Sequence, residues 1–188
     1  MNAMDSQTQM IIGVVVIALI AVAAYLLYRK SQSDRLEHHF GPEYGRAVNA
    51  HGGRDKAEAE LKIREKRVAS FHIVPLAPED AAKFSQAWKV LQGKFVDDPR
   101  GVVVQADELV RDLLSKRGYP MADFERRAAD ISVNYPEVVS NYRAAQAIAA
   151  RDRSGEASTE ELRKAVVHYR ALFAELLETR ETKGEVHS

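Results

Sequence analysis

A run of 19 residues, Met10 to Tyr28, contains no charged residue and no Asn, Gln, Ser or Thr. A helix of that length rises roughly 28 Å, close to the thickness of the hydrocarbon core of a bilayer. Because lipid offers the backbone no hydrogen-bond partners, a single segment can cross it only as a helix. The run therefore predicts a transmembrane helix at residues 10–28, preceded by a short N-terminal tail at residues 1–9.

The same run could instead be the apolar part of a cleaved signal peptide. The sequence Ala21-Val22-Ala23 has the small-x-small form of a cleavage site. However, residues 1–9 contain no Lys or Arg, and apolar residues continue past this site through Leu27. Signal peptides normally begin with basic residues, so we interpret the run as an uncleaved anchor.

Basic residues flank the predicted anchor on one side only. Arg29, Lys30, Arg35 and Arg46 follow it within about 20 residues, whereas the preceding segment offers Asp5 alone among charged side chains. Loops rich in Lys and Arg stay in the cytoplasm. The pattern predicts that the N-terminus lies outside and the C-terminal domain in the cytoplasm, and it makes Arg29 and Lys30 candidate contacts with lipid or a partner.

The rest of the chain is highly charged. All 27 Lys and Arg and all 27 Asp and Glu lie outside residues 10–28, and the formal net charge is zero. This balance argues against a strongly basic nucleic-acid-binding protein. The composition, which includes no Cys, also excludes a collagen-like, low-complexity or disulfide-rich chain.

Residues 29–78 are predicted to form a juxtamembrane region with one charged helix at residues 54–70. Within this helix Glu60 and Arg64 form an i,i+4 pair in the favoured order. Arg64 interrupts a thin apolar stripe, so we expect a largely solvated helix or one half of a helix pair. Interleaved glutamates favour a solvated face. Four of its cations remain candidate contacts with anionic lipid, nucleic acid or a partner: Lys62, Arg64, Lys66 and Arg67.

Residues 79–178 carry five apolar stripes with helical spacing, and no stretch of useful length alternates with a period of two. The first stripe contains Phe84 and Trp88, which we expect in the core; an uncovered aromatic face would instead mark a groove for a partner helix. The sequence therefore predicts an all-α protein with an N-terminal transmembrane helix, a charged juxtamembrane helix, a compact helical bundle at residues 79–178 and a polar tail at 179–188.

Two capping boxes help to place the last two helices of the bundle. Asn134 is followed three residues later by Glu137, and Ser158 is followed by Glu161 at the same spacing. In such a box the first side chain accepts a backbone hydrogen bond and the glutamate returns one. The two patterns predict helices that begin directly after Asn134 and Ser158.

No segment carries a catalytic or cofactor-binding motif, such as a Walker A loop, a GxGxxG loop, a GxSxG elbow or an HExxH sequence. His38-His39 is the only His pair, and Gly41-Pro42 prevents one regular helix from placing His39 and Glu43 on one face. We therefore expect no catalytic residue, metal or cofactor. A pocket in the bundle remains an open alternative, formed by Tyr142, Arg143, His168 and Tyr169.

Four distinctive segments cover most of residues 35–178: HFGPEYGRAV (39–48), KFVDDPRGVVVQADELV (94–110), RGYPMADFERRAADISVNYPEVVSNYRAAQAIAAR (117–151) and GEASTEELRKAVVHYRALFAELLE (155–178). Through them the chain resembles a family of uncharacterised bacterial proteins often labelled hypothetical, membrane or secreted. The resemblance implies a bacterial protein with one N-terminal span and a helical domain, and it implies no reaction. The label "secreted" keeps an exported soluble domain as the alternative topology.

These observations lead to three functional hypotheses for a protein of the bacterial inner membrane. The first is a non-enzymatic module that binds or scaffolds another protein at the membrane surface. The second is a ligand-binding sensor or enzyme with a pocket in the helical bundle. The third is binding of anionic lipid or nucleic acid through residues 54–67, although nucleic acid is disfavoured. The expected partners are thus the lipid bilayer and a second protein.

Overall fold

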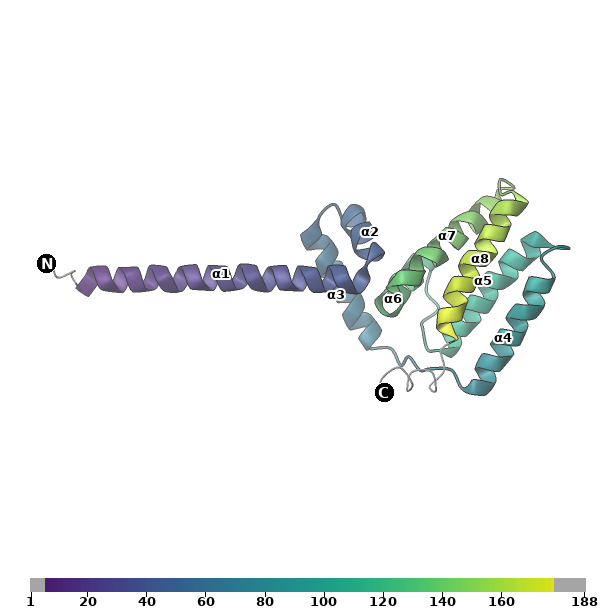
Figure 1. The fold of residues 1–188 in the computed structure, drawn as a ribbon, viewed down its shortest axis with the longest axis horizontal. Coiled ribbons are helices and arrows are strands. Elements are labelled where there is room, and N and C mark those ends of the chain that lie inside the picture. Colours follow the sequence, from purple (N-terminus) through teal and green to yellow (C-terminus); the bar gives the residue numbers. More distant parts are fainter. Residues whose placement is uncertain (1–5, 178–188) are drawn as a thin grey trace. The chain divides into compact units, whose positions relative to one another are not determined.

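The computed structural model describes residues 6–177, and the side chains of residues 10–177. The described residues form eight α-helices and no strand (Figure 1). The chain divides between His39 and Phe40 into two compact units. The all-α prediction is confirmed. Of the two predicted tails, 179–188 and the first five residues of 1–9 lie outside the described residues.

Helix α1, Ser6–Phe40, accounts for the first unit and already includes part of the predicted N-terminal tail. It is long and apolar enough to cross a membrane, and none of the side chains in its most apolar window is buried within the protein. Leu19, for example, is 64% exposed. Soluble monomers rarely expose so large a continuous apolar surface, whereas a bilayer would cover it. The helix continues without a break from the predicted span through residues 29–40.

The second unit opens with two helices, α2 (Pro42–His51) and α3 (Arg54–Ala69). Gly41 and Gly52, with φ values of 47° and 70°, bracket α2 in a conformation that suits glycine. The two helices pack on each other, and the Tyr44 hydroxyl donates to Glu58 Oε1 at 2.9 Å. Helix α3 matches the predicted charged helix, and it is one half of a helix pair.

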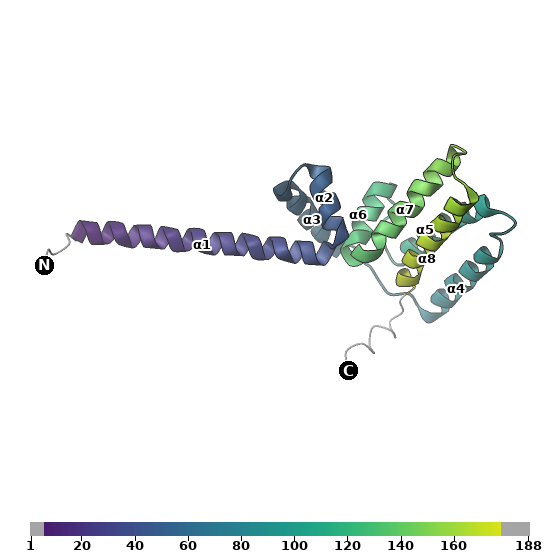
Figure 2. The ribbon, with the colours of Figure 1, turned by 45° about the horizontal axis from the view of Figure 1, so that its top comes forward.

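Five helices follow, as the apolar stripes predict: α4 (Pro78–Gly93), α5 (Pro99–Lys116), α6 (Phe124–Asn134), α7 (Pro136–Arg153) and α8 (Thr159–Leu176). Helices α5, α7 and α8 contact one another at the centre, while α4 packs on α5 and α6 on α7 (Figure 2). Helix α3 in turn packs on α6, and α2 packs on α7. The compact unit therefore begins at Phe40 and takes in the helices assigned above to a juxtamembrane region.

Side-chain caps fix several helix starts. Asp98 accepts from the backbone N–H of Gly101 at the start of α5, and Asp123 accepts from that of Arg126 at the start of α6. The capping box of Ser158 and Glu161 is confirmed at the start of α8. The box predicted at Asn134 is wrong, because Tyr135 occupies the N-cap of α7 and makes no side-chain cap. Helix α6 still includes Asn134, whose amide donates to the Tyr119 hydroxyl instead.

The core of the second unit lies among α4, α5, α7 and α8. The Trp88 ring stacks on Phe173 with centroids 4.7 Å apart, and Tyr142 meets Tyr169 edge to face at 6.3 Å. Trp88 is buried and Phe84 is partly buried against the same cluster, which agrees with the expectation that these aromatics are core residues. Full burial of each large apolar side chain stabilises such a fold by roughly 1.5–3 kcal/mol.

Candidate functional site

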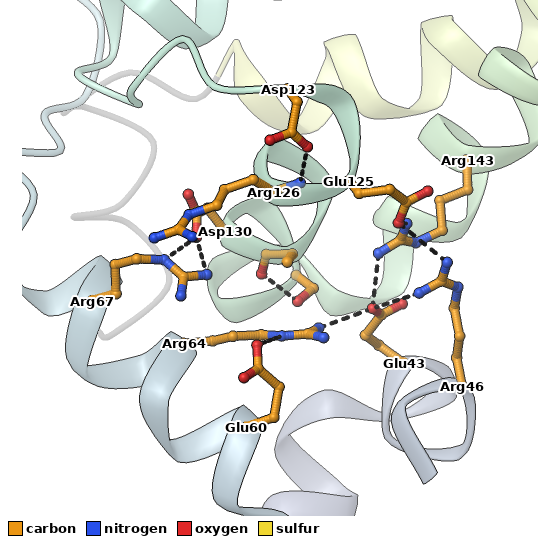
Figure 3. Close-up of polar contacts among 12 residues, drawn as sticks. Glu43, Arg46, Glu60, Arg64, Arg67, Asp123, Glu125, Arg126, Asp130 and Arg143 are labelled. Atoms are coloured by element: carbon orange, nitrogen blue, oxygen red, sulfur yellow. Dashed lines mark hydrogen bonds and ion pairs between the residues drawn. The ribbon is translucent and has the colours of Figure 1, made fainter. Parts of the chain in front are cut away.

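The polar feature of the second unit that joins the most helices is a set of acidic and basic side chains where α2, α3, α6 and α7 meet. We call it the charge cluster (Figure 3). It contains three carboxylates and three guanidinium groups: Glu43, Glu60, Glu125, Arg46, Arg64 and Arg143. Its charges therefore balance.

Glu43 is the centre of the charge cluster and is only 3% exposed. Its Oε1 accepts from Arg64 at 3.1 Å and from Arg143 at 3.0 Å, and Arg46 lies 3.7 Å away. Pro42 begins α2, so Glu43 lies in its first turn, where the helix dipole favours a negative charge. One acid thus receives arginines from three helices.

Arg64 lies on the buried face of α3. The buried residues of this helix follow a regular spacing of four and three: Ala57, Leu61, Arg64 and Val68. The guanidinium continues the stripe that it was expected to interrupt, because α2 delivers Glu43 to meet it. Its Nε also donates to Glu60 Oε1 at 3.2 Å, one turn earlier on α3. The expectation of a largely solvated α3 is wrong for this face.

A second buried pair joins α3 to α6. Arg67 donates through Nε and Nη2 to Asp130 Oδ1 at 2.8 and 2.6 Å. Asp130 is buried, and the Arg67 side chain is 19% exposed. Removing one member of a buried pair strands the other charge and is strongly destabilising. Arg67 and Arg64 therefore hold α3 against the bundle.

These contacts correct half of the predicted surface patch. Arg64 and Arg67 were candidate contacts with lipid, nucleic acid or a partner, but both guanidinium groups are engaged inside the protein. Lys66 is exposed and Lys62 half-buried on the same helix. Arg29 and Lys30 are exposed on α1. The four candidate cations of α3, Lys62, Arg64, Lys66 and Arg67, thus do not form one outward face.

The four residues of the predicted pocket face different surroundings. The Tyr169 hydroxyl donates to Asp107 at 3.2 Å, and the Tyr142 hydroxyl accepts from Arg127 at 2.8 Å. His168 Nδ1 lies 2.8 Å from Asn141 Oδ1, and Arg143 reaches into the charge cluster. Only the two tyrosines are brought together, by ring packing in the core.

The two tyrosines are poorly suited to proton transfer. Burial, reinforced by the negative charge of Asp107, raises the pKa of Tyr142 to about 12. The same two causes raise the pKa of Tyr169 further. Both phenols therefore stay neutral near pH 7. An efficient general acid or base instead needs a pKa close to the working pH.

The charge cluster was not found from the sequence, although one signal was available. Arg64 occupies the position of the α3 stripe where a buried residue belongs, which indicates an acid from elsewhere in the fold. Nothing in the local sequence identifies Glu43 as that acid, since the two residues lie 21 positions apart. The cluster is made only of carboxylates and guanidinium groups, so it holds no hydroxyl, thiol or imidazole nucleophile.

Among the described residues no group of three or more His, Asp or Glu side chains is arranged to hold a metal ion. In comparisons with known proteins, the chain matches no family model, no curated protein and no solved structure.

Proposed function

We propose that this protein is a single-pass membrane protein whose helical domain binds another protein at the membrane surface without catalysing a reaction. The observation that carries the proposal is the apolar helix α1, whose most apolar window has no side chain buried within the protein. It is joined directly to a unit with its own core. An anchor of this kind raises the local concentration of a domain near membrane-bound partners.

The polar groups of the second unit support a binding role over catalysis. The carboxylate of Glu43 is engaged by arginines, and the imidazole of His168 by Asn141. Catalytic groups normally converge on a site that a substrate can reach. In the charge cluster the polar side chains hold helices together, which suits a rigid module that presents a surface.

The proposed location is the inner membrane of a bacterium, with the N-terminus outside and the helical domain in the cytoplasm. Arg29, Lys30 and Arg35 on the C-terminal side of the span favour this orientation. A reporter enzyme that is active only in the periplasm should be silent when fused to the C-terminus and active when fused to the N-terminus. The reverse pattern would assign the exported topology instead.

Partner binding can be tested by placing a photo-crosslinking residue at one exposed position on each of three helices of the full-length protein. Suitable positions are Lys66 on α3, Val90 on α4 and Val167 on α8. A docking surface should give one recurrent adduct in native membranes from one position and none from the others. Absence of a specific adduct from all three positions, with the protein at its natural level, would count against the proposal.

A further inference from the structure

The second unit contains a cavity of about 550 Å³, within the range of roughly 300–1,000 Å³ typical of small-molecule sites. One wall is apolar and is formed by Phe71, Ile73, Val74 and Val133. The lining also includes three charged side chains, Glu65, Arg117 and Glu175, and the polar Asn134 and Tyr135. Neither the charge cluster nor the predicted pocket contributes a residue to it.

Arg117 is the distinctive residue of this cavity. It is 5% exposed, yet no ion pair of the described residues includes it. One terminal nitrogen donates to the carbonyl oxygen of Leu176 at 2.9 Å, and the guanidinium lies over the Tyr135 ring at 5.4 Å. Its Nε is buried and has no hydrogen-bond partner. A buried cation in this state is costly unless an anion joins it.

The backbone around Arg117 keeps the cavity wall in place. The N–H of Val74 donates to the Arg117 carbonyl at 3.0 Å, which holds the connector between α3 and α4 against the end of α5. The next residue, Gly118, has φ 93°, and a Cβ there would overlap the carbonyl oxygen of His72. Glycine therefore allows the close approach that sets the apolar wall beside the guanidinium.

We infer that this cavity binds a small zwitterion with an apolar side chain, the class of the hydrophobic α-amino acids. The ligand carboxylate would take the Nε–H edge of Arg117, since guanidinium groups bind carboxylates through paired N–H donors. The side chain would contact Phe71, Ile73 and Val133. With two glutamates and one arginine, the charged lining carries a net formal charge of −1, which disfavours a simple anion, and the exposed Glu175 offers a carboxylate to an ammonium group. This site does not depend on the proposed protein-binding function.

The inference can be tested by calorimetric titration of the full-length protein in lipid nanodiscs. L-Phenylalanine is the probe, with 3-phenylpropionate and phenethylamine as matched compounds that lack the ammonium and the carboxylate. We expect a Kd of about 1 mM or below for phenylalanine, and at least about tenfold weaker binding of the other two. Equal binding of phenylpropionate would overturn the zwitterion assignment, and no binding of phenylalanine would overturn the site.

Two variants test the cavity from different directions. Arg117→Lys keeps the charge but removes the guanidinium edge, and it should weaken binding by at least about tenfold. Ala69→Phe fills the cavity from an exposed lining position and leaves Arg117 intact, with Ala59→Phe on the outer face of α3 as the matched control. Ala69→Phe should abolish binding and Ala59→Phe should not. Unchanged affinity in Ala69→Phe would place the ligand elsewhere.

A shortened protein that ends at Leu177 tests whether a carboxylate of the C-terminal residues, rather than of a ligand, is the partner of Arg117. Residues 178–188 include Glu178, Glu181 and Glu185. If the cavity is a ligand site, the shortened and the full-length proteins should bind phenylalanine alike. Binding that is seen only in the shortened protein would assign the partner of Arg117 to the C-terminal residues and overturn the inference.

Discussion

Two faces of the second unit are held together by different chemistry. Helix α8 meets α5 and α7 through a stripe that is apolar apart from one phenol, and its buried residues include Leu172 and Phe173. Helix α3 meets α2 and α6 through a stripe of the same period that includes Arg64. Apolar packing asks only that the facing residues fill the volume. The charged interface requires a carboxylate at one particular position, that of Glu43, because the buried guanidinium groups must be paired.

The buried stripe of a helix is therefore not always apolar: it can include a charged residue whose partner another helix supplies. On α8 many side chains share the stabilisation, so each contributes a part. On α3 much of it depends on one carboxylate that serves several arginines. The predictions below probe this contrast: hydrogen exchange follows the charged interface, and the fluorescence of the single tryptophan, Trp88, which is buried against Phe173, follows the apolar one.

The largest effect is expected for Glu43→Ala. The change removes the buried partner of both Arg64 and Arg143 and leaves them only the more exposed Glu60 and Glu125. It should lower the free energy of unfolding of the charged interface by about 3–5 kcal/mol. Hydrogen exchange should show early loss of protection in α2 and α3. Glu60→Ala, at a partly exposed position of the same cluster, is the control and should cost less. Similar losses in the two variants would refute the central role of Glu43.

The next largest effect is expected for Leu172→Ala on the apolar face. Leu172 is fully buried, so the lost transfer energy and the cavity together should cost roughly 3 kcal/mol. Urea unfolding followed by Trp88 fluorescence should shift to lower concentration. Val167→Ala on the exposed side of α8 should leave the midpoint nearly unchanged. If hydrogen exchange speeds up first in α3 of the Leu172 variant, the two faces are not independent.

A smaller effect is expected for Arg64→Met. Methionine keeps the stripe filled, and Glu43 retains Arg143 at 3.0 Å, so no buried acid is stranded. The loss of charged hydrogen bonds should cost about 1–2 kcal/mol, clearly less than Glu43→Ala. The measurement is the same hydrogen exchange in α2 and α3. A loss as large as that of the Glu43 variant would show that the arginine is as essential as the acid.

The smallest effect is expected at the capping box of α8, and it depends on pH. Hydrogen bonds from the Ser158 N–H and hydroxyl, together with Arg151, lower the pKa of Glu161 to about 2 from an ordinary value of 4.5. Because the folded pKa is lower, the contribution is complete above pH 4.5 and disappears as the pH falls toward 2. Glu161→Gln should therefore be destabilised at pH 7, and should approach the wild type near pH 2.

The control for this prediction is Ser158→Ala, which removes a donor to the same carboxylate. Its difference from the wild type should narrow over the same pH range in urea titrations followed by Trp88 fluorescence. A difference that stays constant from pH 7 to pH 2 would contradict the assigned role of Glu161.

The helices could largely be predicted from the sequence, because their signals are local. The residues that form the apolar stripe of α8 are close together in sequence, and so are Ser158 and Glu161 of its capping box. Both features appear as predicted. The box at Asn134 fails because Tyr135 takes the N-cap position and the Asn134 amide bonds to the Tyr119 hydroxyl, 15 positions earlier in the chain. A capping pattern states which bond is available, while tertiary contacts decide whether it forms.

The charge cluster and the cavity could not be predicted, because their partners are distant in sequence. Glu43 and Arg143 are 100 positions apart, and Arg117 reaches a carbonyl 59 positions away. Arg64 and Arg67 stand beside Lys62 and Lys66 in one basic run, and charge alone does not separate the inward pair from the others. The position of Arg64 on the buried stripe of α3 does separate it, whereas Arg67 lies beside that stripe and turns inward only because α6 supplies Asp130.

The separation of Glu43 from Arg143 also has a consequence for the order of events during synthesis. At about 5–20 residues per second, the 100 residues between them take roughly 5–20 s to make. Until α7 has been made, Glu43 can pair only with nearby arginines such as Arg46 and Arg64. Glu43 is thus among the first residues of the second unit to be synthesised. Its last partner, Arg143, follows only when most of the chain has been made.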